Sequence, residues 1–193
     1  MARGICWIES IEYEEADGDL KAIYDSVRGP SGKVDNLYKA YGLRPQSILP
    51  ADDLYRAVLH HPANGLPKWL LELVGSYVAI LCGCDYAYTH HADNFAYLLG
   101  DRERARAILQ ALRDDRLADA GGQREAAILG YVAKLTRTPG DMAQADIRAL
   151  RRAGLQDGEI LEVNQVAAMF AYSVRVINGL GIRLDGEKIG YYS

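Results

Sequence analysis

The sequence has little cysteine, and it has no Cys-x-x-Cys pair. Its 193 residues include three cysteines, at positions 6, 82 and 84, which is too few for a structural disulfide framework and favours reduced or reactive thiols. A dithiol pair beginning at Cys84 would need its second sulfur at position 87, where the chain has alanine. Any function based on thiol chemistry has to account for Ala87.

Excess positive charge and long apolar segments are also absent. The net charge is −4 and the sequence pI is about 5.6, so no nucleic-acid partner is expected. The longest nearly uncharged stretch, 73–84, is too short to cross a bilayer and contains glycine, so no membrane partner is expected. The N-terminus lacks the long apolar segment of a secretory signal, which predicts a cytoplasmic protein.

Sustained alternation of β-branched residues is missing, and apolar residues recur at spacings of three and four. This pattern predicts an all-α fold. The expected helices cover 11–28, 35–41, 47–60, 67–81, 84–99, 101–112, 123–136, 143–153 and 158–179. Glycine and proline mark most of the breaks between them, including a bend at Gly83.

The length predicts one domain, 1–193, in three parts. An N-terminal helical extension covers 1–65, a core with the chemistry-bearing residues covers 66–180, and a tail covers 181–193. The tail contains glycines and a Tyr191-Tyr192 pair, and we expect it to form an irregular arm. That arm would pack either on the core of its own chain or on a neighbouring subunit.

The core places a glutamate, a cysteine and a histidine in helical sequence. Glu72 lies among leucines, and a carboxylate buried there would need a partner. His91 is one helical turn after position 87, where a thiol would have been activated by the imidazole. Cys84 follows Gly83 at a helix N-terminus, which predicts a lowered thiol pKa unless burial outweighs the helix dipole. We therefore expect Cys84 to be alkylated faster than Cys6.

Simpler interpretations exist for each of these residues. Cysteine in an apolar helix is more often a small buried side chain than a nucleophile, Glu72 can be a solvated helix residue, and the pair His90-His91 can bind a loop. His60 and His61 suit a helix C-terminus and are given no chemical role. A metal site formed by Cys82, Cys84, His90 and His91 is disfavoured because those residues face different directions. We expect no metal and no cofactor.

At these residues the sequence resembles the AhpD-like, peroxidase-related branch of the carboxymuconolactone decarboxylase superfamily. The motif of that branch is a glutamate twelve residues before a Cys-x-x-Cys pair and a histidine four residues after the second cysteine; Glu72, Cys84, Ala87 and His91 fall on this spacing. The segments 13–45, 124–163 and 175–184, and a closing GYY, also look like this branch. The resemblance implies an AhpD-like helical domain.

The resemblance also implies a function. Such proteins reduce alkyl hydroperoxides through a thiolate, sulfenic acid and disulfide cycle, supported by a thiol or dithiol donor, in antioxidant defence. By this resemblance Glu72 and His91 would be the proton relay and Cys84 the resolving cysteine, while Ala87 replaces the attacking cysteine. It further implies a homo-oligomer, a trimer or hexamer, for which the apolar C-terminal helix and tyrosine-bearing tail are suited.

Three explanations of Ala87 stay open: an engineered removal of the nucleophile, a dithiol moved to Cys82 and Cys84, or a protein that has left peroxidase chemistry. The second would give a strained, easily reduced ring. Two alternative functions accompany the thiol peroxidase. One is a cofactor-free lyase like carboxymuconolactone decarboxylase, with His91, Arg175 and Tyr88 as candidates for holding a carboxylate. The other is a non-catalytic helical assembly.

Overall fold

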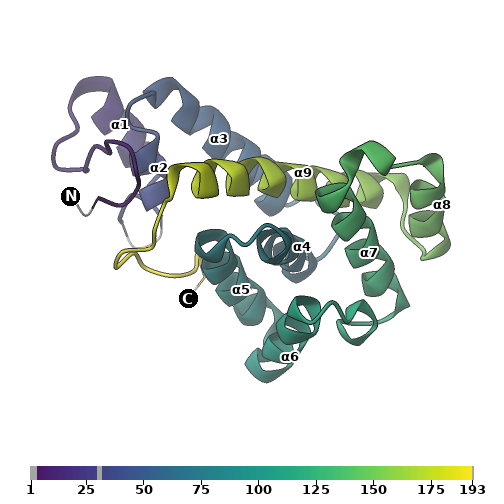
Figure 1. Cartoon of the computed structure of the whole chain (residues 1–193). Helices are drawn as coiled ribbons and strands as arrows, with labels where there is room; N and C mark the ends of the chain where they lie inside the picture. Colours follow the sequence, from purple (N-terminus) through teal and green to yellow (C-terminus); the bar gives the residue numbers. More distant parts are fainter. Residues whose placement is uncertain (1–3, 30–31, 193) are drawn as a thin grey trace.

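The computed structural model describes residues 4–29 and 32–192. The regular secondary structure in that part of the chain is entirely helical (Figure 1). The predicted all-α class is therefore confirmed. The α-helices are α1 (Gly18–Ser26), α2 (Asn36–Ala40), α3 (Ile48–Tyr55), α4 (Lys68–Leu81), α5 (Asp85–Leu99), α6 (Arg102–Arg113), α7 (Gln123–Arg137), α8 (Gln144–Arg152) and α9 (Asp157–Leu180). Four short helical turns join them: η1 (Pro45–Ser47), the π-turn η2 (Arg56–His60), η3 (Leu117–Asp119) and η4 (Pro139–Asp141).

Helix α4 lies at the centre of the fold. It packs against α5, α7 and α9, and every residue from 70 to 79 is buried. A helix that is apolar on all sides can be stable only inside a core, and the sequence of α4 has that character. Pro67 precedes its first turn, where a missing N–H costs nothing.

The first helix is shorter than predicted. The expected helix over 11–28 begins only at Gly18, because the chain before it forms a turn in which the N–H of Ala16 donates to the carbonyl of Glu12. Gly18 has a φ of +47°, a conformation that glycine adopts without strain and that interrupts a continuous helix. The predicted helix therefore loses its first two turns.

The N-terminal helices carry a small core of their own. Tyr24 is fully buried there, and its hydroxyl donates to the carbonyl of Ile11 at 2.9 Å. This second cluster consists of Ala16, Tyr24, Val27, Val34, Tyr38 and Ile48. This cluster is separate from the main hydrophobic core.

The C-terminal arm, residues 182–192, folds back over the chain's own helices. The Asn36 side chain donates to the carbonyls of Arg183 and Leu184, and the N–H of Tyr191 donates to Oδ1 of Asn94 at 2.6 Å. Figure 1 shows the arm passing from the end of α9 to α5. Of the two expected positions for the tail, the structure shows the one on its own core.

Among the described helices, α9 alone is long and apolar enough to pass a test for a membrane-spanning segment, and 44% of the tested window is buried inside the protein. Core helices of soluble proteins pass the same test.

Candidate functional site

The site is built on a hydrogen-bonded pair of side chains, Glu72 of α4 and His91 of α5. Glu72 has no exposed surface, and its Oε2 lies 2.7 Å from Nδ1 of His91. Asn94, one turn further along α5, donates to Oε1 of Glu72 at 3.3 Å. The expectation that Glu72 is buried with a partner is confirmed. Because a carboxylate accepts hydrogen bonds, it fixes the proton of neutral His91 on Nδ1 and leaves Nε2 as the basic atom.

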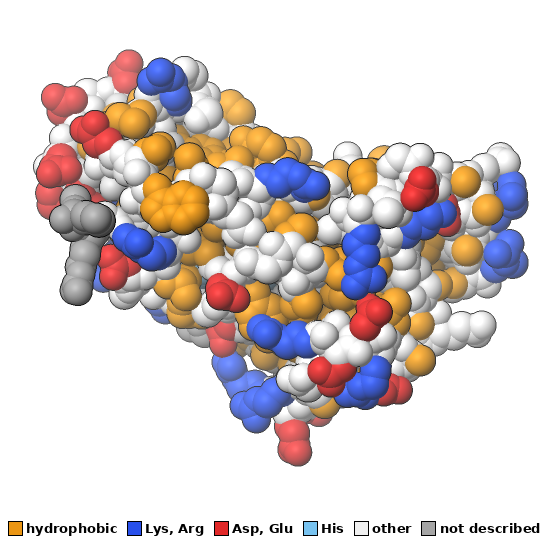
Figure 2. Space-filling model, in the orientation of Figure 1, with side chains coloured by type: hydrophobic (Ala, Val, Ile, Leu, Met, Phe, Trp, Pro, Cys, Tyr) orange, Lys and Arg blue, Asp and Glu red, His pale blue; other side chains and the backbone are white. Residues whose placement is uncertain are grey.

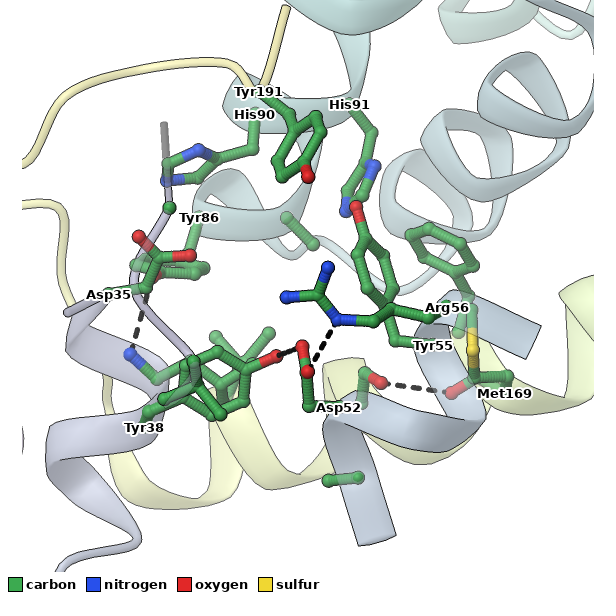
Figure 3. A pocket seen from close by; sticks show the side chains of 18 of the residues that line it. Asp35, Tyr38, Asp52, Tyr55, Arg56, Tyr86, His90, His91, Met169 and Tyr191 are labelled. Atoms are coloured by element: carbon green, nitrogen blue, oxygen red, sulfur yellow. Dashed lines mark hydrogen bonds and ion pairs between the residues drawn. The ribbon is translucent and has the colours of Figure 1, made fainter. Parts of the chain in front are cut away.

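His91 is on the wall of a cavity of about 140 Å³. Aromatic side chains dominate the wall, and α9 and the N-terminal extension supply much of it (Figure 3). The ring of His91 also meets Phe170 edge-on, with 4.5 Å between centroids. The lining includes Asp35, Leu37, Tyr38, Tyr41, Asp52, Tyr55, Arg56, Tyr86, Ala87, His90, His91, Asn94, Met169, Phe170, Tyr172, Ser173 and Tyr191.

Ala87 lines this cavity together with His91, one turn away on α5. The helical prediction that placed these two positions side by side is therefore confirmed. Cys84 is buried at the N-cap of α5, and the residues that line the cavity in the described chain include no cysteine. The wall that would carry an attacking thiol carries a methyl group.

The expected lowering of the Cys84 pKa is wrong. Burial raises the pKa of the Cys84 thiol, and this effect outweighs the backbone N–H groups of Ala87 and Tyr86, which lower it. Burial likewise raises the pKa of Cys82, which Arg175 lowers to a smaller extent. All three cysteines are free. The helix N-terminus is present, but the apolar surroundings decide the direction of the shift.

Two cationic side chains, Arg56 and Lys188, line the cavity, and the two residues proposed by type lie elsewhere. The Nε of Arg56 donates to Oδ2 of Asp52 at 2.6 Å, and the other oxygen of Asp52 accepts from Tyr38 at 2.8 Å. Figure 3 shows the guanidinium group reaching into the cavity. Tyr88 instead packs beneath Arg113, and Arg175 binds the carbonyl of Ala171.

The C-terminal arm forms one part of the cavity wall, through Gly190 and Tyr191. The N–H of Gly190 donates to Nδ1 of His90 at 3.3 Å, so the expectation that a histidine of the pair binds a loop is met by His90. The Tyr192 hydroxyl lies 2.8 Å from Nδ1 of His60, and burial lowers the pKa of His60 to about 4. His60 was given no role from the sequence, yet its ring packs against Tyr55, which also contacts His91.

The metal-site alternative does not form in the structure. His90 and His91 line the cavity while neither Cys82 nor Cys84 does. Within the described residues there is no group of three or more His, Cys, Asp or Glu side chains that could hold a metal ion.

Comparison with solved structures shows which known proteins share this fold. An AhpD core protein of Ralstonia eutropha JMP134, described as an uncharacterized peroxidase-related protein, matches with a TM-score of 0.80 and 21% identity over 94% of this chain and 93% of that one. The fold is that of the AhpD-like proteins. A peroxidase-related protein from Silicibacter sp. TM1040 matches with a TM-score of 0.78 and 21% identity over 94% of both chains.

A third solved structure with a similar fold carries a different activity in its name. It is a cysteine-to-alanine variant of the debrominase Bmp8 in complex with 2,3,4-tribromopyrrole, with a TM-score of 0.71 and 14% identity over 90% of this chain and 89% of that chain. No protein-family model and no curated protein matches the chain. The resemblance expected from the motif is confirmed through the fold.

Several site residues were missed from the sequence. Asn94 had a detectable signal, because it lies three residues after His91 and so shares its helix face. Asp35, Asp52, Arg56 and Glu187 had none, because they come from the extension and the arm and meet α5 only in the folded chain.

Proposed function

We propose that this AhpD-like protein is a cofactor-free acid–base enzyme that moves protons on a small organic substrate. The observation that carries the proposal is the buried Glu72–His91 pair, with its 2.7 Å hydrogen bond, on a cavity where position 87 offers no thiol. Glu72 orients the imidazole and stabilises the imidazolium that forms when His91 takes a proton. The proton relay is therefore complete without a redox residue.

The cavity favours a small, flat, weakly polar substrate. Tyrosine and phenylalanine rings cover much of its wall, and Arg56 and Lys188 are cationic residues of its lining. The guanidinium group of Arg56 reaches into the cavity. A small carbonyl acid fits this lining, since its apolar part would contact the rings and its carboxylate would meet the guanidinium group. Bmp8, which has the same fold, binds a small flat ring. This proposal is related to the cofactor-free lyase alternative of the sequence, with Arg56 in the place given to Arg175 and Tyr88.

Hydrogen exchange at the methylene group of phenylpyruvate tests the proposal. In D₂O, the protein should speed the loss of the methylene proton signal above the buffer rate. Glu72→Gln removes the carboxylate that stabilises the imidazolium, and His91→Ala removes the base; each should lower the rate by about 10²-fold or more. His61→Ala is the matched control, because that ring is exposed and outside the cavity. A wild-type rate equal to buffer would overturn the proposal.

A thiol-dependent peroxidase is the second candidate. Two structural neighbours are described as peroxidase-related proteins, which favours this candidate. The position of Ala87 on the cavity wall beside His91 also favours it. Its substrates would be a small hydroperoxide and a thiol or dithiol donor. Because neither Cys82 nor Cys84 lines the cavity, activity of this kind on the cavity wall requires a cysteine at position 87 and is tested by restoring one.

A homo-oligomer, a trimer or a hexamer, stays a proposal. Leu161 and Tyr172 of α9 are more than half exposed, at 56% and 53%, and Trp7 is 72% exposed. Figure 2 shows apolar surface over α9 and the N-terminal helices. Exposed apolar side chains of this size favour association. Light scattering should give a mass above 21.3 kDa at micromolar concentration; the monomer mass would contradict assembly.

A further inference from the structure

The two adjacent histidines of α5 each face a carboxylate from a different part of the chain. His91 binds Glu72 of α4 at 2.7 Å, while Nε2 of His90 lies 3.8 Å from Oε2 of Glu187, in the C-terminal arm. Both rings line the cavity. The Glu72–His91 pair accounts for one proton-accepting group, and the surroundings of His90 hold a second titratable cluster that the proposed function does not use.

Glu187 is held firmly in this cluster. Its side chain is 7% exposed, and Oε1 accepts from the N–H of Asn36 at 3.0 Å and from the Tyr86 hydroxyl at 3.1 Å. The hydrogen bond from Gly190 to Nδ1 of His90 puts the proton of the neutral ring on Nε2, toward Glu187. At 3.8 Å this contact is too long for a hydrogen bond, and His90 therefore satisfies Glu187 only in part.

Asp35 completes the cluster and reaches the cavity. Its carboxyl interacts with that of Glu187, and Asp35 lines the cavity whereas Glu187 does not. Two carboxyl groups that interact in this way cannot both be ionised at low cost, which favours one proton held by the pair. Figure 3 shows Asp35 and His91 on different walls of the same cavity.

The charges around Asp35 favour the protonated form. Burial is the largest effect and the charge of Glu187 the next, and together with other groups they raise the Asp35 pKa to about 7. The titratable groups that interact with Asp35 come from three helices and the arm: Tyr38 of α2, Asp52 and Tyr55 of α3, Tyr86 and His90 of α5, and Glu187 of the arm. Of these, His90 alone acts to lower the pKa of Asp35.

We propose that Asp35 is a second catalytic residue, the proton donor opposite His91, and that the substrates are small carbonyl compounds that react through an enol. Glu187 is a positioning residue, because its charge favours the protonated form of Asp35. This inference rests on the proposed acid–base function and adds the acid to it. The C-terminal arm is then a working part of the site, because it supplies Glu187.

The proton transfers balance without a redox partner. The bond between the substrate carbon and its acidic hydrogen breaks as Nε2 of His91 takes the proton. The electron pair moves into the new carbon–carbon double bond, and the carbonyl oxygen takes the proton of Asp35. The product is an enol, an imidazolium and an aspartate. Return of the two protons regenerates the enzyme and gives a ketone exchanged or isomerised at that carbon.

The phenylpyruvate exchange assay, run from pH 5 to 9 in the full-length chain, tests this assignment. Wild-type kcat should fall as pH rises through about 7, where Asp35 loses its proton. Asp35→Asn should lower kcat by about 10- to 100-fold at pH 6, change KM little, and remove that fall. Glu187→Gln should shift the fall to lower pH, because the charge that raises the Asp35 pKa is gone. Asp185→Asn, an exposed carboxylate of the same arm, should change nothing.

The outcomes separate this inference from the proposed function. If Glu72→Gln abolishes exchange but Asp35→Asn keeps the wild-type kcat and pH profile, Asp35 is not the acid and the inference fails alone. If Glu187→Gln lowers kcat without moving the profile, its role is structural and the positioning part is overturned. Circular dichroism checks that each variant is folded. A wild-type protein at the buffer rate overturns the proposed function and this inference together.

Discussion

Gly75 of α4 and Phe170 of α9 touch so closely that a side chain at Gly75 would overlap the ring. A Cβ built on Gly75 would lie 2.3 Å from Cζ of Phe170. The same ring packs edge-on against His91. The glycine thus lets α9 approach α4 and places an aromatic edge beside the imidazole of His91, so packing in the core and geometry at the site depend on one residue.

Gly75→Ala should therefore destabilise the protein and disturb the site. Overpacking costs about 1 to 3 kcal/mol, which exceeds the gain of about 1 kcal/mol that alanine brings to a helix interior. Phenylpyruvate exchange should fall as well, because the ring has to move toward His91. Gly130→Ala on α7 is the control: its Cβ would meet nothing within 4 Å, so urea unfolding should show it to be stabilised. Equal midpoints for the two variants would contradict this packing.

The cysteines should react in an order set by burial. Cys82 is partly exposed, whereas Cys6 and Cys84 are buried, and burial raises the pKa of the Cys84 thiol. Iodoacetamide near neutral pH should therefore label Cys82 first, and Cys84 should react appreciably only after unfolding in urea. Peptide mass spectrometry follows each site, and Cys82→Ser should leave the folded protein almost unlabelled. Labelling of Cys84 as fast as Cys82 would show a reactive thiol after all.

His60 and Asp35 should give the folding stability two opposing pH dependences. Burial lowers the pKa of His60 to about 4, so the unfolded chain binds the extra proton below about 6.5 and stability falls as pH drops toward 4. Asp35 has a folded pKa of about 7, raised from 3.8, so the folded state holds the extra proton and stability falls as pH rises from about 4 to 7. The two effects oppose each other between about pH 4 and 6.5.

Asp35→Asn should remove one of these effects. The free energy of unfolding of the variant should rise with pH between about 4 and 6.5 more steeply than that of wild type, since the His60 contribution is no longer opposed. Urea unfolding at half-unit steps of pH measures the slope. Asp53→Asn, an exposed carboxylate on α3, should keep the wild-type slope. An unchanged slope in Asp35→Asn would mean that Asp35 titrates normally in the folded state.

Helical periodicity was sufficient to predict the all-α class and the shared face of Ala87 and His91 on α5, and the apolar neighbours of Glu72 predicted its burial. The pairing of Glu72 with His91 came from the resemblance to AhpD-like proteins. Periodicity could not predict the rest of the site. Tyr86 and Glu187 are 101 residues apart in the chain, and no local pattern brings the arm to α5. The same limit explains Cys84: sequence shows a helix N-terminus but not the depth of burial. Arg175 and Tyr88 were chosen by type, and only packing places Arg56 in the cavity instead.

Restoring a thiol at position 87 should produce peroxidase activity. Ala87→Cys places a sulfur on the cavity wall, in the first turn of α5 and one turn from His91, where the helix N-terminus favours a thiolate. The thiolate would attack the peroxide oxygen, releasing an alcohol and leaving a sulfenic acid. The Cys84 thiol would then displace water to form a disulfide, which a dithiol donor reduces. The extra atom should cost no more than about 1 to 3 kcal/mol.

Consumption of cumene hydroperoxide with dithiothreitol, together with a count of free thiols, measures this gain. The Ala87→Cys protein should consume peroxide clearly faster than the wild-type chain, and adding Glu72→Gln should lower the rate again by weakening proton transfer. Ala87→Ser is the matched control, because it adds an atom of similar size with no redox chemistry and should stay at the wild-type rate. A folded Ala87→Cys protein that forms no disulfide and consumes no peroxide would exclude the thiol-peroxidase candidate and leave acid–base chemistry as the use of the Glu72–His91 pair.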